Sequence, residues 1–416
     1  MISKICIVTN IFPSKSETFV SLLVLELLIR GYDVSVISLY NPKDKEQLSI
    51  SSLPNDLKNK FDSLKIFRSK YDRSLSKFIL FFVTIKYTLK LLYKKSFFYK
   101  LIKLIVQFKF NKIMEIVFDY DTLKGLDDRT IIHFQYATLA FRYETLVKYN
   151  LVDGDLKRFF SIRGYDISKY SERNIIDWNL LFTNSRKVFP VCNFFKNELI
   201  KLGCREDKIS VVYSPIETSY YSSFHPPSNT ELLFKIVSVG RMVEKKGFDD
   251  AIKAASLLKI KGIDFKWVFV GQGALLESFK IKVEELELSD RVVFLGGLNS
   301  SETFKIIGDS NLLVAPSKRA QDGDREGIPN VLKEAMLLGL PVLSTYHSGI
   351  PELIGKDSFG YLVNENDPSA LVDMIIFILN NYKSEALLKR ASTIDSVYNK
   401  FNKELYINRM LTEYFE

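Results

Sequence analysis

The sequence predicts an α/β protein built from two or three domains. Its 416 residues are too many for one hydrophobic core, and its 47% hydrophobic and 26% charged content is that of an ordinary globular chain. Apolar runs that indicate buried strands alternate along the chain with stretches rich in helix formers. This alternation is typical of a parallel sheet whose helices cross over its faces.

The first half of the chain contains several such units. A buried strand over residues 4–9 should lead into a helix that ends at Gly31, and a second strand should follow. Later elements are a strand over residues 130–137 that runs into a loop, a strand, turn and helix over residues 188–203, and a last strand over residues 209–213. The segment that begins at Ser214 is then expected to link two domains.

The second half opens with an apolar strand over residues 234–240, which carries Arg241 into a loop and places Lys246 just before the next helix. Two cations at the carboxyl end of a strand suit a diphosphate that must leave with two negative charges. Further strands are expected at residues 267–270, 291–296 and 360–363. A helix from Pro368 closes the sheet, and the last amphipathic segment spans residues 397–415.

The most informative stretch lies between residues 311 and 345. An apolar strand is followed by a polar loop with Glu326, a helix that begins near Pro329 and carries Glu334 one turn in, and another strand. The unpaired N–H groups of Gly327, Ile328 and Asn330 and the helix dipole attract anions. Such a site can hold a sugar at one end, a diphosphate over the amides and a ribose at the other. The alternative is structural: Glu326 would interact with the helix dipole, and Glu334 would be a solvated residue on the helix surface.

The surrounding sequence decides between these readings. EGIPNVLKE from Glu326 to Glu334, then GLPV and HSGIPELI, resembles the retaining nucleotide-sugar glycosyltransferases of family GT4, and within them the exopolysaccharide subgroup of colanic acid and amylovoran biosynthesis. The resemblance runs nearly end to end. It implies the GT-B fold, in which two Rossmann-like, doubly wound domains face each other across a cleft. The expected limits are residues 1–214 for the acceptor domain, 215–396 for the donor domain and 397–416 for a helix that returns to the first domain.

The resemblance also implies roles for single residues. Arg241 and Lys246 would grip the donor diphosphate, Glu326 would bind the hydroxyls of the sugar and Glu334 the ribose, and Gly327, Ile328, Pro329 and Asn330 would complete the donor site. His133, at the end of its strand, would face the donor sugar from the other domain. No residue is assigned as a covalent nucleophile, and no metal or other cofactor is implied.

The acceptor side is expected in the first domain. Many members of the family have a glycine-rich loop after the first strand, whereas this chain has none, and Glu17 would repel a phosphate. Ser16 and Glu17 are therefore expected on the cleft wall, or else Ser14 and Glu17 form a helix capping box. The segment around Arg163 and Asp166 resembles a family motif in which a histidine stands where Arg163 does, and an arginine there can grip a phosphate.

Residues 73–114 hold ten lysines or arginines, no acidic residue and many aromatic residues. Lys86, Lys90 and Lys94 recur at every fourth position and so share a helix face opposite an apolar one. This pattern predicts binding to an anionic membrane surface; a solvated helix face over the core is the alternative. No motif for nucleic-acid recognition accompanies it.

Composition limits the location and the chemistry. The apolar run at the N-terminus is too short for a signal peptide, no run reaches the length of a membrane span, and three cysteines without metal spacing indicate a reducing cytosol. The protein is therefore expected in the cytoplasm, on the inner face of the membrane. Asp322 and Asp324 mimic a metal motif of a different glycosyltransferase fold, and metal binding there is not expected.

The sequence and the resemblance thus predict a glycosyltransferase that moves a sugar from a nucleoside diphosphate to a glycan acceptor during assembly of a bacterial surface polysaccharide. The acceptor is expected to be lipid-linked, because the basic residues favour a membrane surface. Two alternatives are a nucleotide-sugar epimerase of the same fold and a non-catalytic membrane scaffold. An epimerase needs no acceptor but does need carboxylates placed for proton abstraction. A scaffold would explain the basic stretch but not Arg241, Lys246, Glu326 and Glu334 together.

Overall fold

The structure is a computed structural model that describes residues 4–14, 17–40, 59, 61–68, 110–126, 129–152, 154–172, 176–216, 233–355 and 358–416. Most of the basic stretch over residues 73–114 lies outside these ranges, as does Ser16. Within the described part of the chain, no helix is both long enough and apolar enough to cross a membrane.

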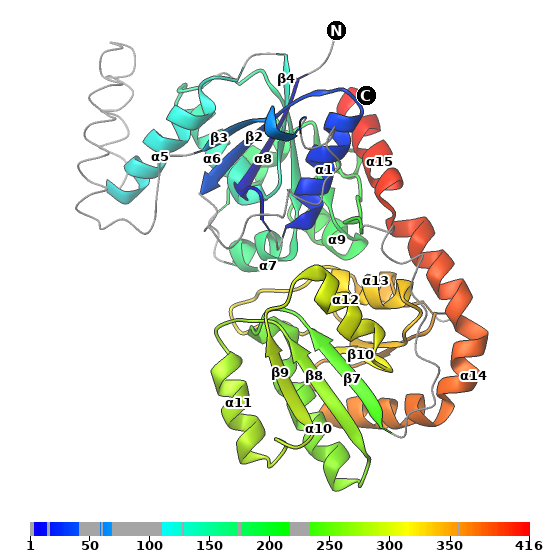
Figure 1. Ribbon diagram of the computed structural model, residues 1–416. Coiled ribbons are helices and arrows are strands. Elements are labelled where there is room, and N and C mark those ends of the chain that lie inside the picture. The colour runs from blue at the N-terminus through cyan, green and yellow to red at the C-terminus, as the bar shows by residue number, and fades with distance from the viewer. Residues whose placement is uncertain are drawn as a thin grey trace.

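The first domain is built on a sheet of six parallel strands (Figure 1). The strands are β1 (Lys4–Ile11), β2 (Asp33–Tyr40), β3 (Lys65–Arg68), β4 (Thr130–Phe134), β5 (Lys157–Ile162) and β6 (Lys187–Pro190). The helices of this domain are α1 (Thr18–Ile29), α5 (Phe110–Leu123), α6 (Ala137–Lys148), α7 (Gly164–Glu172), α8 (Trp178–Asn184), α9 (Asn193–Lys201) and the short η3 (Glu206–Lys208).

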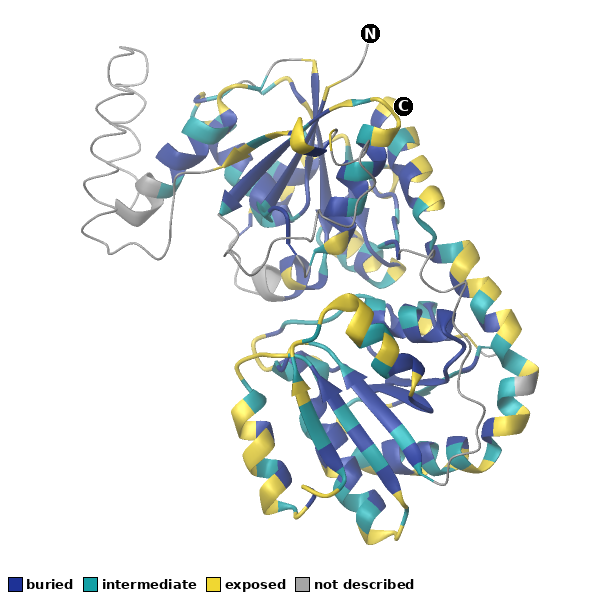
Figure 2. Ribbon diagram, in the orientation of Figure 1, coloured by how far each residue is buried: buried dark blue, intermediate teal, exposed yellow. Residues whose placement is uncertain are grey.

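The second domain repeats this plan. Its strands are β7 (Phe234–Val239), β8 (Phe265–Val270), β9 (Val292–Gly296), β10 (Leu312–Ala315), β11 (Val342–Thr345) and β12 (Gly360–Val363). Its helices are η4 (Glu244–Lys246), α10 (Phe248–Ile260), α11 (Leu276–Glu285), α12 (Ser300–Gly308), α13 (Asn330–Leu337) and η5 (Ile350–Glu352). The central strands β10 and β11 are fully buried, the edge strands β9 and β12 are only partly buried, and the outer helix faces are exposed (Figure 2).

Both sheets have the strand order of a doubly wound nucleotide-binding fold. The first runs β3-β2-β1-β4-β5-β6, and the second runs β12-β11-β10-β7-β8-β9, which is the same order read from the other edge. The order reverses between β1 and β4 in the first sheet and between β7 and β10 in the second. Ligands of such sheets bind beside the carboxyl ends of the strands at this point of reversal. The loops after these four strands are therefore the places to look for a site.

The chain crosses between the domains twice, and the two crossings lie side by side. The long helix α14 (Pro368–Phe401) packs on α10 and α13 of the second domain, and α15 (Lys403–Phe415) packs on α1 of the first (Figure 1). At the first crossing, the N–H group of Ile216 donates to the carbonyl of Phe401 at 3.0 Å. Met410 and Tyr414 of α15 are buried in the core of the first domain.

The fold predicted from the sequence is confirmed, with two local differences. Residues 209–213 were expected to form a strand, but only a single bridge joins Ile209 to Val188. The last helix was expected from residue 397, whereas α14 continues to Phe401 and the break falls at Asn402, whose side chain caps α15 by accepting from the N–H of Leu405. The exact domain limits stay a prediction.

Candidate active site

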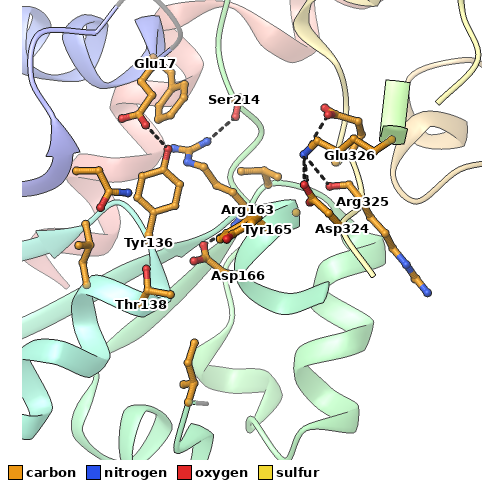
Figure 3. Close-up of a pocket in the computed structure, with 18 of the residues that line it drawn as sticks. Glu17, Tyr136, Thr138, Arg163, Tyr165, Asp166, Ser214, Asp324, Arg325 and Glu326 are labelled. Atoms are coloured by element: carbon orange, nitrogen blue, oxygen red, sulfur yellow. Dashed lines mark hydrogen bonds and ion pairs between the residues drawn. The ribbon is translucent and has the colours of Figure 1, made fainter. Parts of the chain in front are cut away.

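A cavity of about 1470 Å³ lies between the two domains. Its lining includes residues from the loops after β1, β4 and β5 of the first domain and after β7 and β10 of the second. In Figure 3, Glu17, Tyr136 and Arg163 lie on one side of the cavity and Asp324 and Glu326 on the other. The cavity therefore joins the reversal points of both sheets.

The loop after β10 forms the second-domain wall of this cavity. It brings Asp324 and Arg325 to the cavity, followed by the run from Glu326 through Val331. Pro329 stands at the N-cap of α13 with no side-chain cap, so the first N–H groups of the helix have no side-chain acceptor at that position. The residues predicted to form the donor site, Glu326, Gly327, Ile328, Pro329 and Asn330, thus lie together around a helix N-terminus.

Glu326 is held by two lysines of η4. Its Oε1 lies 3.2 Å from Nζ of Lys245 and 3.3 Å from Nζ of Lys246. Burial alone would raise the pKa of Glu326, but the positive charges of Lys246 and Lys245 outweigh it and lower the pKa to about 2. Glu326 is consequently a carboxylate at any physiological pH.

Arg241 and Lys246 line the same cavity from the loop after β7. The Arg241 side chain is exposed, and no other described residue forms an ion pair or side-chain hydrogen bond with it. Two cations thus line the same cavity as the N-terminus of α13, an arrangement that suits a diphosphate.

The backbone of Glu326 is supported by a histidine that the sequence analysis did not assign. The Glu326 N–H donates to Nε2 of His347 at 3.1 Å, and Nδ1 of His347 lies 2.7 Å from Oε1 of Glu365. Since Nε2 accepts, the ring proton sits on Nδ1 and is donated to Glu365. Oε2 of Glu365 also accepts from the N–H of Arg319 at 2.9 Å. His347 was present in the quoted HSGIPELI motif, but nothing local showed which backbone group it would meet.

Glu334 lies one turn into α13 and does not belong to the cavity lining. Burial raises its pKa to about 7, although the neighbouring Lys333 opposes the shift. Lys333 itself is fully buried and donates to the carbonyl of Ser214 at 2.7 Å, so it ties α13 to the first crossing between the domains. The ribose-binding role of Glu334 stays a prediction.

The first-domain side of the cavity contains three of the four residues predicted there. Glu17 lies at the N-cap of α1 without capping it, and its carboxylate accepts from the hydroxyls of Tyr136 at 2.7 Å and Thr9 at 3.0 Å. The capping box is therefore not formed, and Glu17 lines the cavity as expected. The fourth residue, Ser16, is outside the described residues.

Arg163 and Asp166 also line the cavity, but each is held by protein groups. The Arg163 guanidinium donates to Ser214 at 3.0 Å and to Gln135 at 3.2 Å and lies 3.5 Å over the ring of Phe19. Burial raises the pKa of Asp166 to about 7, against the opposing effect of hydrogen bonds from backbone N–H groups, chiefly that of Arg163. Arg163 is thus fixed at the junction of the domains.

The prediction that His133 faces the donor sugar is wrong. His133 is fully buried and does not line the cavity. Its Nδ1 lies 2.6 Å from the hydroxyl of Tyr414 and its Nε2 lies 2.9 Å from Oγ of Ser161. Burial and the positive charge of Arg163 lower the pKa of His133 to about 3, so the ring is neutral. His133 anchors the C-terminal helix to the first sheet.

The two domains touch through glycines beside the cavity. A Cβ on Gly164, at the start of α7, would lie 1.9 Å from the carbonyl oxygen of Arg325, and a Cβ on Gly349 would lie 2.7 Å from Cβ of Cys192. Nearby, the carboxylate of Glu352 accepts from the backbone N–H groups of Asn193 and Phe194, at 2.8 and 2.9 Å, at the N-terminus of α9. These contacts hold the loop after β10 and the segment after β11 against the first domain.

The two aspartates of the D-x-D motif do not form a carboxylate pair directed at an ion. Asp324 is paired with Lys245 at 3.1 Å, and Oδ1 of Asp322 accepts from the N–H of Asp324. Within the described ranges, no group of three or more histidine, cysteine, aspartate or glutamate side chains is arranged to hold a metal ion.

Two doubly wound domains that face each other across a cleft, with cations and a helix N-terminus at its centre, define the GT-B class of nucleotide-sugar enzymes. The chain belongs to the glycosyl transferases group 1, whose family model matches residues 225–394. This is the GT4 family of retaining glycosyltransferases, and the resemblance seen in the sequence is confirmed.

Three relatives illustrate the family. The chain is 33% identical over 288 residues to the Escherichia coli K12 protein assigned as colanic acid biosynthesis glycosyltransferase WcaL. The aligned region covers 68% of this chain and 69% of that protein. It is 32% identical over 297 residues, 70% of each chain, to the amylovoran biosynthesis glycosyltransferase AmsK of Erwinia amylovora. It is 30% identical over 167 residues, 40% of this chain and 43% of the other, to the N-acetylgalactosamine-N,N'-diacetylbacillosaminyl-diphospho-undecaprenol 4-alpha-N-acetylgalactosaminyltransferase of Campylobacter jejuni.

Solved structures agree in fold. The sucrose-phosphate synthase of Thermosynechococcus elongatus superimposes with a TM-score of 0.72 at 17% identity, over 99% of this chain and 98% of that one. The Anabaena protein HepE, solved in complex with UDP and glucose, superimposes with a TM-score of 0.66 at 14% identity, over 99% and 98%. At these identities the likeness shows the fold alone.

Proposed function

We propose that this protein transfers a sugar from a nucleoside diphosphate donor to a hydroxyl group of a glycan, with retention of anomeric configuration, during assembly of a bacterial surface polysaccharide. The observation that carries the proposal is the cluster of Arg241, Lys246 and Glu326 around the N-terminus of α13, inside the cavity between the domains. Its relatives named for colanic acid and amylovoran biosynthesis support the polysaccharide.

Each residue of the cluster has a role in the proposal. Arg241 and Lys246 stabilise the negative charge that develops on the leaving diphosphate, together with the N–H groups of the helix N-terminus. Glu326, a carboxylate at the pH of the cell, accepts hydrogen bonds from hydroxyls of the donor sugar. The departing phosphate helps to deprotonate the acceptor hydroxyl on the same face of the sugar. The cationic side chains supply the charge stabilisation, so no metal or other cofactor enters the proposal.

The acceptor is proposed to enter from the first domain and to be lipid-linked. The walls there combine polar groups with Tyr136, Phe141, Tyr149 and Tyr165, all of which line the cavity and offer faces on which sugar rings can stack. The Campylobacter relative is named for a diphospho-undecaprenol-linked substrate. The basic and aromatic composition of residues 73–114 supports docking on an anionic membrane surface, where such acceptors reside.

A screen of nucleotide sugars for protection against thermal unfolding tests the donor part of the proposal. We expect one nucleotide sugar to raise the melting temperature of the wild-type protein. Release of nucleoside diphosphate from that donor should then depend on an added glycan acceptor. Acceptor-independent conversion of the donor into its epimer would point to the epimerase, and no binding at all would favour the scaffold.

Vesicle binding tests the membrane part separately. The full-length protein should bind phosphatidylserine or phosphatidylglycerol vesicles at low salt and dissociate as the salt concentration rises. Replacement of Lys86, Lys90, Lys94 and Lys95 by Gln should release it from vesicles and leave donor affinity intact. A wild-type protein that ignores anionic vesicles at low salt would show that residues 73–114 serve another purpose.

A further inference from the structure

Glu326 shares one oxygen between two lysines that are adjacent in sequence. Nζ of Lys245 lies 3.2 Å and Nζ of Lys246 lies 3.3 Å from the same Oε1 atom. Only Lys246 has a role in the proposed function, as a ligand of the donor diphosphate. The presence of a second lysine on the same oxygen therefore needs its own explanation.

The surroundings of the two lysines differ. Lys245 is 7% exposed, and its Nζ also lies 3.1 Å from the carboxylate of Asp324 and 3.5 Å from the carbonyl oxygen of Arg325. Lys246 is more exposed, and Glu326 is its one ion-pair partner among the described residues. Lys245 is thus held by oxygens of three residues, Glu326, Asp324 and Arg325, whereas Lys246 can exchange its single ion-pair partner for a ligand.

Donor binding would remove part of the positive charge that neutralises the Glu326 carboxylate. A diphosphate with two negative charges competes for Lys246 better than a single carboxylate does, because charge-assisted hydrogen bonds strengthen with charge. Without a second cation, Glu326 would then be a buried carboxylate that lacks a counter-charge. Burial favours the neutral form of such a group, and a protonated or displaced Glu326 could not accept from sugar hydroxyls in the same way.

We infer that Lys245 is a positioning residue that holds the Glu326 carboxylate in place after Lys246 has turned to the donor diphosphate. Asp324 keeps Lys245 from following Lys246 toward the phosphates, because its carboxylate already pairs with Nζ of Lys245 at 3.1 Å. The inference rests on the proposed function, since it takes the diphosphate as the ligand of Lys246.

The charged groups around Glu326 are consistent with these separate roles for Lys245 and Lys246. Two cations of η4 contact its carboxylate, and His347 after β11 contacts its backbone. The other charged groups that line the cavity near it are Asp324 and Arg325 on its own loop, Arg241 after β7, and Arg163 and Asp166 of the first domain. Of these groups, only Lys245 and Lys246 form ion pairs with Glu326, so removal of Lys245 leaves Lys246 as its sole close counter-ion.

The test compares Lys245→Met and Lys245→Gln with the wild-type protein in full length. Calorimetry with UDP, GDP, UDP-glucose, UDP-N-acetylglucosamine, GDP-mannose and GDP-fucose identifies the preferred donor. We expect both variants to bind the nucleoside diphosphate within about threefold of wild type, because Arg241 and Lys246 remain. Turnover of the nucleotide sugar should fall by about 10²-fold, and the acid limb of its pH profile should move to higher pH as Glu326 gains a proton more easily.

Lys318→Met is the matched control. Lys318 is also a buried lysine, with Nζ 2.8 Å from both Asp249 and Asp250, but it does not line the cavity. Its loss should lower the melting temperature and leave the pH profile of the folded protein unmoved. In addition, Lys245→Met should have no further effect on turnover in a Glu326→Gln background, because the charge that Lys245 holds is then absent.

The outcomes distinguish a failure of the proposed function from a failure of the role inferred for Lys245. A wild-type protein that binds none of the six nucleotides overturns the proposed function and the inference with it. A wild-type protein that binds and turns over a donor, with a Lys245→Gln variant of unchanged turnover and unchanged pH profile, overturns the inference alone. If Lys245→Met does not fold, Lys245→Gln, alone and in a Glu326→Gln background, still decides the question.

Discussion

The close approach of Gly164 to Arg325 predicts that a single methyl group will force the domains apart. A Cβ on Gly164 would lie 1.9 Å from the Arg325 carbonyl oxygen, whereas ordinary contacts begin at 3.4 Å, a shortfall of about 1.5 Å. The obstructing atom belongs to the backbone, so no side-chain rotation can make room. In Gly164→Ala, the loop that carries Glu326 must therefore withdraw from the first domain by more than 1 Å.

Such a displacement moves the proposed donor site of the second domain away from the acceptor side of the cavity in the first domain, and it alters no side chain of either site. Misplacement of reacting groups by 1 Å can cost about 10²-fold in rate, and we expect a loss of that size in turnover of the nucleotide sugar. Binding of the nucleoside diphosphate alone should stay within about threefold, because Arg241 and Lys246, its proposed ligands, both belong to the second domain. Steady-state kinetics and calorimetry on the same preparation measure the two effects.

Gly125→Ala is the control, because a Cβ there would meet no atom within 4 Å. This variant should match the wild type in both measurements. A folded Gly164→Ala protein with wild-type turnover would refute the reasoning, since it would show that catalysis does not require the contact between the domains.

Three further predictions concern the site itself. Glu326→Ala should lose activity by orders of magnitude and keep its fold, as measured by turnover and circular dichroism, because the residue lies in a polar loop; near-normal turnover would remove it from the site. His347→Phe should reduce turnover more than it reduces binding of the nucleoside diphosphate, because the Glu326 N–H loses its acceptor, and His347→Gln should recover part of the loss. Activity should persist in EDTA, and a strict requirement for a divalent ion would show that Asp322 and Asp324 deserve a metal-binding role after all.

The sequence was sufficient to predict the fold and to group the residues that are proposed to bind the donor. The apolar runs, the glycine after α13 and the spacing of Glu326 and Glu334 are local signals, and they correctly placed β10, α13 and β11. The loops after β7 and β10 meet because parallel strands bring their carboxyl ends to one edge of a sheet. Arg241, Lys246 and Glu326 could therefore be grouped before any coordinates were known.

The distant partners of buried polar side chains could not be predicted from the sequence in this way. His133 ends a strand beside the cleft, but its direction was set by Tyr414, which is 281 residues away and arrives with the C-terminal helix. Lys245 and Lys246 are neighbours in sequence with the same chemistry, and it is their contacts with Asp324 and Arg325 that distinguish them. Single-sequence patterns report periodicity and motifs, whereas the partner of a buried polar group depends on how distant elements pack.

Lys246 and its neighbours are proposed to stabilise a leaving nucleoside diphosphate in this cavity. The most direct test is the rate of acceptor-dependent nucleoside diphosphate release by Lys246→Ala, relative to the wild type, with the donor found by thermal protection. Loss of one preorganised charge at a developing anion typically costs about 3 kcal/mol, so the rate should fall by about 10²-fold. A Lys246→Ala protein that releases nucleoside diphosphate at the wild-type rate would contradict the account.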